Sequence, residues 1–443
     1  MTIIRPLLAI AVLFASAASA QVAPLSAADS DPVKMGWMQG APPPPEKQVR
    51  HDNSSMWVFP MTRWSFSHWR ELVPTTAIRR GPKPVMLPRA ERPGLSDKRI
   101  DAISFTPLGA AAPMTWEQSL AANYTDGIVV LHQGRIVYER YFGAGGPDTQ
   151  HIIFSVTKSF VGTLAETLIA EGRLDPARTI ASYIPELSAS GYGDATVRQV
   201  MDMRTSVTFD EAYAGNGKDL PDMTRLSIGT GAVPPQPGYT GPATLTGFLA
   251  AIGKTPGIPH GGDFVYRTTN TDVLAWVLHR VTGEPVARQI EARYWLTMGM
   301  EQPADIQVDR IGTAFAGGGM SAALRDLARF GEMIRLGGRW NGAQIVPPAA
   351  IKAIMAPGDA QAFAAAKYPG LDGGSYASQW WHRAAGQTMA VGVHGQGIYI
   401  DPQAEMVIAR FGSFPVATNR VINPTTLPAY DALAAQLMRA TSH

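Results

Sequence analysis

The strongest constraint on the fold is that two strand pairs lie at opposite ends of the chain. Residues 128–131 and 136–141 are apolar and β-branched runs that flank a turn at 133–135, and residues 397–400 and 406–411 repeat this pattern around a turn at 401–404. The sequence between about 176 and 338 is mostly of helical pattern. We therefore predict an α+β fold, with an antiparallel sheet built from N- and C-terminal strands, flanked by helices and carrying a mainly helical inserted subdomain.

The segment before this domain differs in composition. Residues 21–115 hold four consecutive prolines at 42–45 and tryptophans at 37, 57, 64 and 69. Polyproline favours an extended chain, whereas the aromatic residues indicate that the chain is docked. We expect 21–115 to be an extension docked on a catalytic domain of residues 116–443, with the helical insertion at about 176–338. A sugar-binding platform made by the aromatic residues is the alternative.

The first twenty residues have the pattern of a secretory signal. A single charge, Arg5, precedes an apolar run from Leu7 to Phe14, and Ala18-Ser19-Ala20 is a cleavage pattern before Gln21. We expect an exported protein, periplasmic or secreted, with no stable membrane span after cleavage. An uncleaved anchor is the alternative, although the run is shorter than the ~20 residues of a spanning helix.

Composition excludes several classes of function. The formal net charge is only +2 and no Lys/Arg-rich run occurs, which argues against nucleic acid as a partner. There are no cysteines, and the nine histidines lack ligand spacing, so we predict neither a metal site nor a cofactor. The chain has no Gly-x-Ser-x-Gly motif, which argues against an α/β-hydrolase. Its Gly317-Gly318-Gly319 run lacks the Lys-Ser/Thr ending of a phosphate-binding loop and is better interpreted as a turn.

The candidate nucleophile is Ser155, because Lys158 follows it at the spacing of one helical turn. Apolar residues at 156, 160, 164 and 168 predict a helix that ends near Glu171-Gly172. Residues i and i+3 of a helix lie on one face, so the lysine amine can reach the serine hydroxyl. The alternative is that the two residues are an ordinary exposed pair on a helix. However, the segment is apolar, and burying a lysine that has no functional role there would cost free energy.

Two further segments could complete such a site. Tyr266 ends a polar loop just before a predicted helix at 273–278, and a tyrosine hydroxyl could share a proton with the lysine. Residues 393–398 open a predicted strand, where glycines allow close approach to a ligand and N–H groups could face an oxyanion. A core tyrosine and a simple glycine turn are the alternatives.

Taken together, these motifs carry a family resemblance. Ser155-Val156-Thr157-Lys158, Tyr266-Arg267-Thr268 and Gly395-Gln396-Gly397 follow one another in the order of the three motifs of the serine β-lactamase and penicillin-binding superfamily. The resemblance covers about residues 116–438 and is nearest to the class C branch with its esterases. Within it the chain is most similar to the 6-aminohexanoate-dimer (nylon-oligomer) hydrolases, including Gly36-Trp37-Met38 and residues 63–68 of the extension.

The resemblance implies specific roles. Ser155 would attack a carbonyl to form an acyl-enzyme, Lys158 and Tyr266 would shuttle the proton, and the N–H groups of Ser155 and Ile398 would hold the oxyanion. The residues expected to contact the substrate, a small ester or amide, are Tyr213, Thr268, His394 and Gly397.

The second and third motifs depart from the β-lactamase pattern. Tyr266-Arg267-Thr268 replaces Tyr-x-Asn, and no lysine precedes the glycine pair of the third motif. These losses favour an esterase or amidase. A β-lactamase or D-alanyl-D-alanine carboxypeptidase remains an alternative, as does a non-catalytic penicillin-binding-like receptor module. The sequence leaves the oligomeric state and the natural substrate open.

Overall fold

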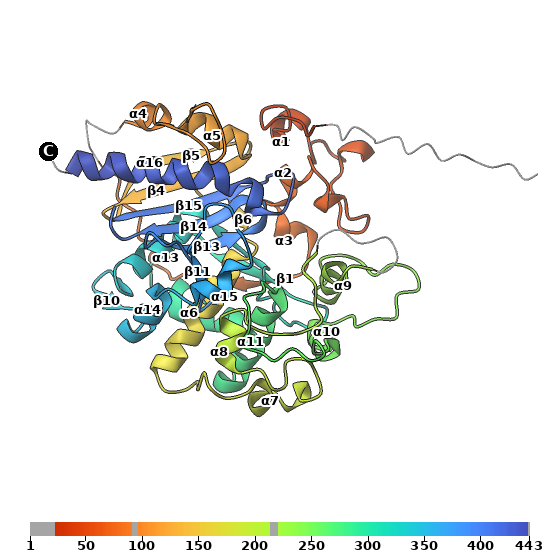
Figure 1. Cartoon of the computed structure of the whole chain (residues 1–443). Helices are drawn as coiled ribbons and strands as arrows, with labels where there is room; N and C mark the ends of the chain where they lie inside the picture. Colours follow the sequence, from red (N-terminus) through yellow and green to blue (C-terminus); the bar gives the residue numbers. More distant parts are fainter. Residues whose placement is uncertain (1–22, 91–95, 213–219, 442–443) are drawn as a thin grey trace, which may run out of the picture.

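A seven-stranded antiparallel sheet forms the centre of the molecule (Figure 1). The computed structural model describes residues 23–90, 96–212 and 220–441. The strand order is β11 (Ser375–Ala377), β12 (Trp380–His382), β13 (Thr388–Gly392), β14 (Gln396–Asp401), β15 (Met406–Gly412), β4 (Thr125–His132) and β5 (Arg135–Tyr141).

Strands from the two ends of the predicted catalytic domain meet inside this sheet. β15 pairs with β4 in an antiparallel register that places Ala409 opposite Val129 and Val407 opposite Leu131. The predicted hairpins are β4–β5 and β14–β15, and they lie side by side. The predicted α+β fold with a sheet made from both ends is confirmed.

Alternate side chains of the strands point to opposite faces of the sheet, and each face has its own core. Val129 and Ile398 pack on one face with α13 (Leu324–Arg335). Ile128 and Ile408 pack on the other face with α5 (Trp116–Ala122) and α16 (Asn423–Thr441). The sheet is therefore covered by helices on both sides.

The half of the molecule below the sheet in Figure 1 is mainly helical, and the molecule contains a second sheet. The four-stranded sheet has the order β1 (Thr75–Ile78), β7 (Ala304–Gln307), β8 (Met320–Ala323) and β6 (Gln150–Ile152). The helices of this half of the molecule are α6 (Val156–Ala170), α7 (Ile180–Tyr183), α8 (Val197–Met201), α9 (Asp222–Gly229), α10 (Leu245–Ala251), α11 (Thr268–Thr282) and α12 (Val286–Ile290). A π-helix, η4 (Glu291–Trp295), follows α12.

Shorter elements complete the fold. Two further strand pairs are β2 (Ser104–Phe105) with β3 (Met114–Thr115) and β9 (Arg339–Trp340) with β10 (Ala343–Gln344). Three further α-helices are α4 (Asp97–Asp101), α14 (Pro348–Met355) and α15 (Ala360–Ala364).

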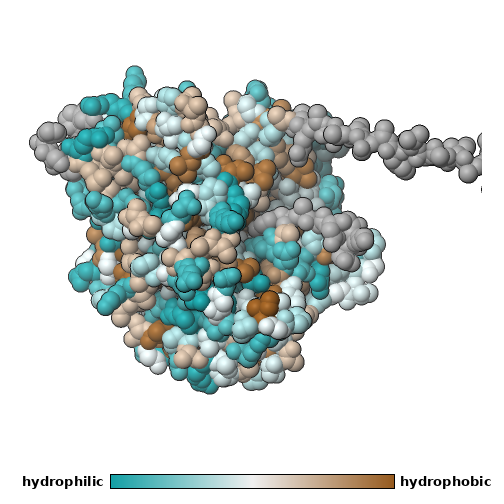
Figure 2. All heavy atoms as spheres, viewed as in Figure 1, coloured by the Kyte–Doolittle hydropathy of each residue, from teal (hydrophilic) through white to brown (hydrophobic). Residues whose placement is uncertain are grey.

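The N-terminal extension lies against the main body as a set of short turns, with α1 (Pro32–Met35), α2 (Thr62–Ser65) and α3 (Trp69–Leu72). Its aromatic side chains form a core cluster with Ile152 and Phe154 of the main body. Arg63 makes a buried ion pair of 2.8 Å with Asp126 of β4. On the face shown in Figure 2, apolar residues gather where the extension meets the sheet.

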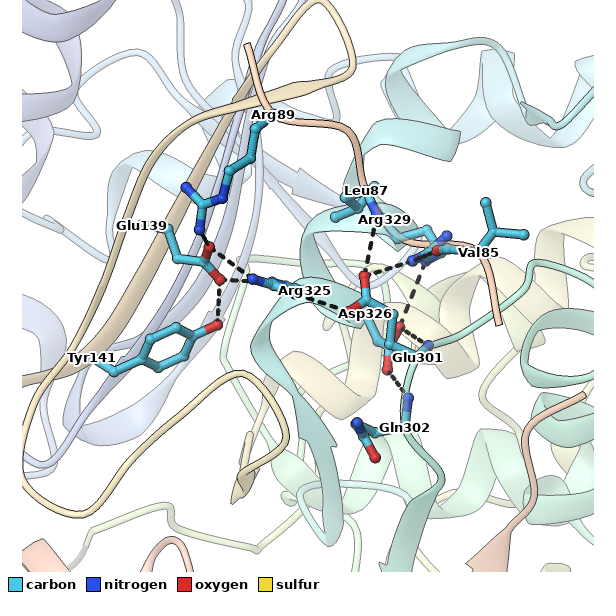
Figure 3. Close-up of polar contacts among 10 residues, drawn as sticks. All are labelled: Val85, Leu87, Arg89, Glu139, Tyr141, Glu301, Gln302, Arg325, Asp326 and Arg329. Atoms are coloured by element: carbon cyan, nitrogen blue, oxygen red, sulfur yellow. Dashed lines mark hydrogen bonds and ion pairs between the residues drawn. The ribbon is translucent and has the colours of Figure 1, made fainter. Parts of the chain in front are cut away.

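A buried ionic network ties α13 to the strands (Figure 3). Arg325 donates to Glu139 of β5 at 2.7 Å and to Glu301 at 3.2 Å, and Arg89 pairs with the same Glu139. Asp326 accepts the N–H of Glu301 at 2.7 Å. Both glutamates are almost fully buried, so their charges depend on these partners.

No helix in the described part of the chain is long and apolar enough to cross a membrane. The expected signal sequence, residues 1–20, lies outside the described residues.

Candidate active site

Ser155 lies at the start of α6, three residues after the end of strand β6. Phe154 has a positive φ of 43°, which turns the chain from the strand into the helix and sets Ser155 at the helix N-terminus. The Nζ of Lys158 donates to the Oγ of Ser155 at 2.9 Å. Both residues are buried, with exposed fractions of 8% and 1%. The expected juxtaposition of the two side chains is present.

Lys158 is surrounded by oxygen atoms. Its Nζ also donates to Thr268 Oγ1 at 3.1 Å and to the carbonyl of Gly317. Burial lowers the pKa of Lys158 to about 8, and the negative charges of Glu211 and Asp272 oppose that shift. An amine with a pKa near 8 is deprotonated often enough at neutral pH to act as a base.

Two carboxylates approach Lys158 through intermediate groups. Glu211 accepts a hydrogen bond from Thr268 Oγ1 at 2.6 Å, and Asp272 accepts the N–H of Gly317 at 2.8 Å. Burial raises the pKa of Asp272 to about 7, and the positive charge of Lys158 works against the rise. Local sequence pattern does not indicate a role for Glu211, Asp272 or Gly317, although the need of a buried lysine for negative partners points to acidic residues near it.

Tyr266 lies beside the serine–lysine pair, two residues before α11. Its ring centroid is 5.1 Å from the Nζ of Lys158, and its ring stacks on Trp381 of β12 at 5.4 Å. Tyr266 and Ser155 line the same cavity. The structure thus brings together Ser155, Lys158, Tyr266 and Thr268, which the sequence analysis placed in one site.

Ser155 borders two cavities. The larger, of about 390 Å³, is lined by Tyr266, Trp381, Tyr368 and the charged side chains of Glu211 and Arg420. The smaller, of about 290 Å³, is lined by the residues Trp57, Trp69, Phe154, Met223, Leu226 and His394, among others. Val393 lines both cavities.

The expected positions of Ile398 and Gly397 require correction. Both lie in β14, between β13 and β15, and neither lines a cavity that borders Ser155. Val391 of β13 lines the larger cavity beside Ser155, and Val393, the residue just after β13, lines both cavities.

His394 lies where a substrate could touch it, in the wall of the smaller cavity. Its Nδ1 is 2.6 Å from the carbonyl oxygen of Phe414, and its ring packs against Phe66 and Phe154. Burial lowers the pKa of His394 to about 4, so the ring is neutral at pH 7. Tyr213, the other expected contact, lies outside the described residues.

No group of three or more His, Cys, Asp or Glu side chains in the described ranges is arranged to hold a metal ion.

Comparisons with known proteins agree with this geometry. The model of the Beta-lactamase family matches residues 117–427. The 6-aminohexanoate-dimer hydrolase of Paenarthrobacter ureafaciens is 34% identical over 360 residues, which are 80% of this chain and 86% of that protein.

Solved structures show the same fold. A Bacillus anthracis protein, provisionally assigned as a 6-aminohexanoate-dimer hydrolase, superposes with a TM-score of 0.78 at 29% identity and covers 90% of this chain and 99% of its own. EstCE1, a hydrolase with promiscuous acyltransferase activity, has a TM-score of 0.52 at 18% identity over 72% of this chain and 99% of its own. The resemblance seen in the motifs is confirmed, and the chain belongs to the β-lactamase family, as a serine hydrolase related to 6-aminohexanoate-dimer hydrolase.

Proposed function

We propose that this protein hydrolyses an ester or amide bond through an acyl-enzyme on Ser155. The observation that carries the proposal is the 2.9 Å hydrogen bond between Ser155 Oγ and Lys158 Nζ in a buried setting. Neutral Lys158 accepts the hydroxyl proton as Ser155 Oγ bonds to the substrate carbonyl carbon. The same proton then passes to the leaving oxygen or nitrogen, and water attacks the acyl-enzyme in the reverse sense.

Tyr266 is the proposed partner of Lys158 in moving this proton. Its ring lies against the amine and borders the larger cavity with Ser155. A tyrosine hydroxyl there can donate to the leaving atom while the lysine restores its proton, so the pair titrates as a unit.

The oxyanion site in this proposal consists of the backbone N–H groups of Ser155 and Val393. Ser155 caps the buried N-terminus of α6, where the helix dipole favours negative charge. Val393 replaces Ile398 in this role because it is the residue after β13 that borders the serine. A tetrahedral intermediate between these two segments would receive two donors.

The test is a Ser155→Ala variant assayed on p-nitrophenyl acetate. We expect kcat to fall by about a thousandfold or more, because the nucleophile is lost. A fluorophosphonate probe should add its mass to Ser155 in the wild type and to no residue of the variant.

Ser159→Ala is the matched control, since Ser159 is a buried serine one turn along α6 whose hydroxyl donates to Gln379 O at 2.8 Å. It should retain the label and most of the activity. Full turnover by Ser155→Ala, or labelling of another residue in the wild type, would refute the proposal.

Export is part of the proposal and rests on the sequence pattern of residues 1–20. We expect the mature protein from its native host to begin at Gln21 and to be found in the periplasm or the medium. Amino-terminal sequencing after cell fractionation tests this, and an intact Met1 in the cytoplasmic fraction would contradict it.

A further inference from the structure

The two cavities that meet at Ser155 differ in chemistry, and this difference bears on the substrate. The larger cavity carries the charged side chains of Glu211 and Arg420 beside Tyr266. Among the described residues that line the smaller cavity, none is Asp, Glu, Lys or Arg. A substrate bound across the serine would therefore place its two halves in unlike surroundings. The inference that follows rests on the proposed function.

The position of Tyr266 indicates which half of the substrate enters which of the two cavities. Tyr266 lines the larger cavity and does not line the smaller one. The group that protonates the leaving atom must lie within hydrogen-bond reach of it. The leaving group therefore faces the larger cavity, and the acyl group, on the other side of the carbonyl carbon, faces the smaller one.

The wall of the smaller cavity is aromatic and is supplied in part by the N-terminal extension. Trp57 and Trp69 pack edge to face at 4.9 Å, and Trp69 packs against Phe154 at 5.8 Å. The indole N–H of Trp57 donates to Ala232 O at 3.2 Å, and that of Trp69 donates to Gln307 Oε1 at 3.1 Å. With both N–H groups occupied by protein acceptors, the rings offer the cavity an apolar surface.

The polar groups in this wall are neutral. His394 is uncharged at pH 7, and its Nδ1 is engaged with the carbonyl of Phe414. Met223 and Leu226 of α9 close the cavity with further apolar surface. A cationic group carried into this space would lose its hydration without gaining a counter-charge among the described lining residues.

We propose that the smaller cavity binds the acyl part of the substrate and selects uncharged, apolar acyl chains, with Trp57 and Trp69 of the extension as specificity-determining residues. The substrate class is thus an ester or amide of a medium-length aliphatic or aromatic acid. An ω-ammonium acyl chain, such as that of a linear 6-aminohexanoate dimer, is a poor fit.

The experiment compares three p-nitrophenyl esters that share one leaving group: the acetate, the heptanoate and the 6-aminohexanoate. The last two have acyl chains of equal length and differ in a terminal methyl against an ammonium group. For the wild type at pH 7 we expect kcat/KM for the heptanoate to exceed that for the 6-aminohexanoate by about tenfold or more. Equal values, or a preference for the 6-aminohexanoate, would overturn the proposal.

Variants locate the effect in the cavity wall. Trp57→Ala should lower the heptanoate-to-acetate ratio of kcat/KM by about fivefold or more, because a half-buried ring that contacts the chain is removed. Trp57→Phe should restore most of the ratio. The matched control is Trp37→Ala, since Trp37 is a buried tryptophan of the extension that does not line the cavity.

The control should leave the heptanoate-to-acetate ratio within about twofold of the wild type. A ratio unchanged in Trp57→Ala would overturn the role of the extension. Acetate turnover reports the active fraction of each preparation, so misfolding does not alter the ratio. Absence of turnover on all three esters, or turnover that survives Ser155→Ala, would instead show that the proposed function itself is wrong.

Discussion

At the scale of single residues, the site is governed by the cost of burying an amine. Lys158 is 1% exposed, and an isolated ammonium at such a depth would be strongly destabilised. Glu211 and Asp272 reduce that cost without touching the amine, one through Thr268 and the other through Gly317. The opposing effects of burial and of the two carboxylates leave the pKa of Lys158 at about 8, so both its neutral and its protonated forms are present near neutral pH.

Asp272 is therefore expected to set the pH at which the enzyme becomes active. An anion beside Lys158 raises the pKa of the lysine, so Asp272→Asn should lower that pKa further below about 8. Because the neutral amine is the base, activity should appear at lower pH. We expect the acid limb of kcat/KM to move down by about half a pH unit or more.

The pH profile of kcat/KM on p-nitrophenyl acetate from pH 5 to 9 measures this shift. The asparagine retains an oxygen that can accept the N–H of Gly317 and so preserves the geometry. Asp305→Asn is the control, since Asp305 is another buried acid whose pKa burial raises to about 6, and Lys158 is not among the charges that act on it. An acid limb that stays in place, or moves upward, in Asp272→Asn would show that Asp272 does not act on the lysine.

Contacts between residues close in the sequence could be predicted, whereas contacts between distant segments could not. Ser155 and Lys158 are three residues apart on one helix, so their contact follows from local geometry. Asp272 reaches the site through a hydrogen bond to Gly317, 45 residues further along the chain. Ile398 was expected to face the serine but lies in β14 and lines neither cavity at Ser155, because a pattern of alternating residues locates a strand but does not show which neighbouring strand faces the serine.

At the scale of elements, α6 is held in place by close contact with the turn at Ser378–Gln379. A Cβ at Gly162 would lie 2.2 Å from the carbonyl oxygen of Ser378 and 2.6 Å from Cβ of Gln379. The hydroxyl of Ser159 donates to Gln379 O on the same side. Glycine at 162 therefore allows the nucleophile-bearing helix to touch the backbone of the turn.

Gly162→Ala should consequently destabilise the protein, although alanine is the better helix former by about 1 kcal/mol. The clash is with backbone, so α6 or the turn must move, and we expect a loss of about 2 kcal/mol in the free energy of unfolding. Urea denaturation followed by circular dichroism measures it.

Gly229→Ala in α9 is the control, because its added Cβ would have neighbours no closer than 3.4 Å. It should be neutral or stabilising. A stabilising effect of Gly162→Ala would mean that the close contact between α6 and the turn is absent.

The elements themselves were predictable where the local pattern was long. The hairpins β4–β5 and β14–β15 and helix α6 follow from alternation and from helical spacing. The four-stranded sheet was not foreseen, because its strands have three or four residues and pair segments far apart in the chain, such as Thr75 with Gln307. Such strands carry too few residues for a period to be recognised.

At the scale of the whole molecule, the extension and the main body share one interior. Arg63 of the extension is 5% exposed, pairs with Asp126 of β4, and donates to the hydroxyl of Ser413 at 3.0 Å. Burial favours a higher pKa for Asp126, but the charge of Arg63 and the neighbouring His151 outweigh it and hold that pKa below its usual range. Trp57 and Trp69 at the same time form a wall of the site. The contacts that hold the extension against the main body therefore also position two residues that line a cavity at Ser155.

We therefore expect the extension and the main body to unfold together, and Arg63→Met to weaken the whole protein. Removing the arginine leaves Asp126 buried without its cation, which costs about 3 kcal/mol or more at pH 7. A carboxyl whose folded pKa is depressed contributes stability above its unfolded pKa and loses it as the pH falls. In the variant, where Arg63 no longer offsets burial, the pKa of Asp126 should rise, so the destabilisation should shrink toward pH 4 as the carboxyl of the variant takes up a proton.

Urea unfolding at pH 7 and pH 4 tests this, with tryptophan fluorescence and far-UV circular dichroism recorded on the same samples. Trp37, Trp57, Trp64 and Trp69 are four of the ten tryptophans, so fluorescence is sensitive to the extension. The two signals should change at the same urea concentration in the wild type. Arg50→Met is the matched control, because its ion pair with Asp52 is more than half exposed and should contribute little to the free energy of unfolding. An early fluorescence transition, or equal effects of the two arginine variants, would show that the extension folds apart from the main body.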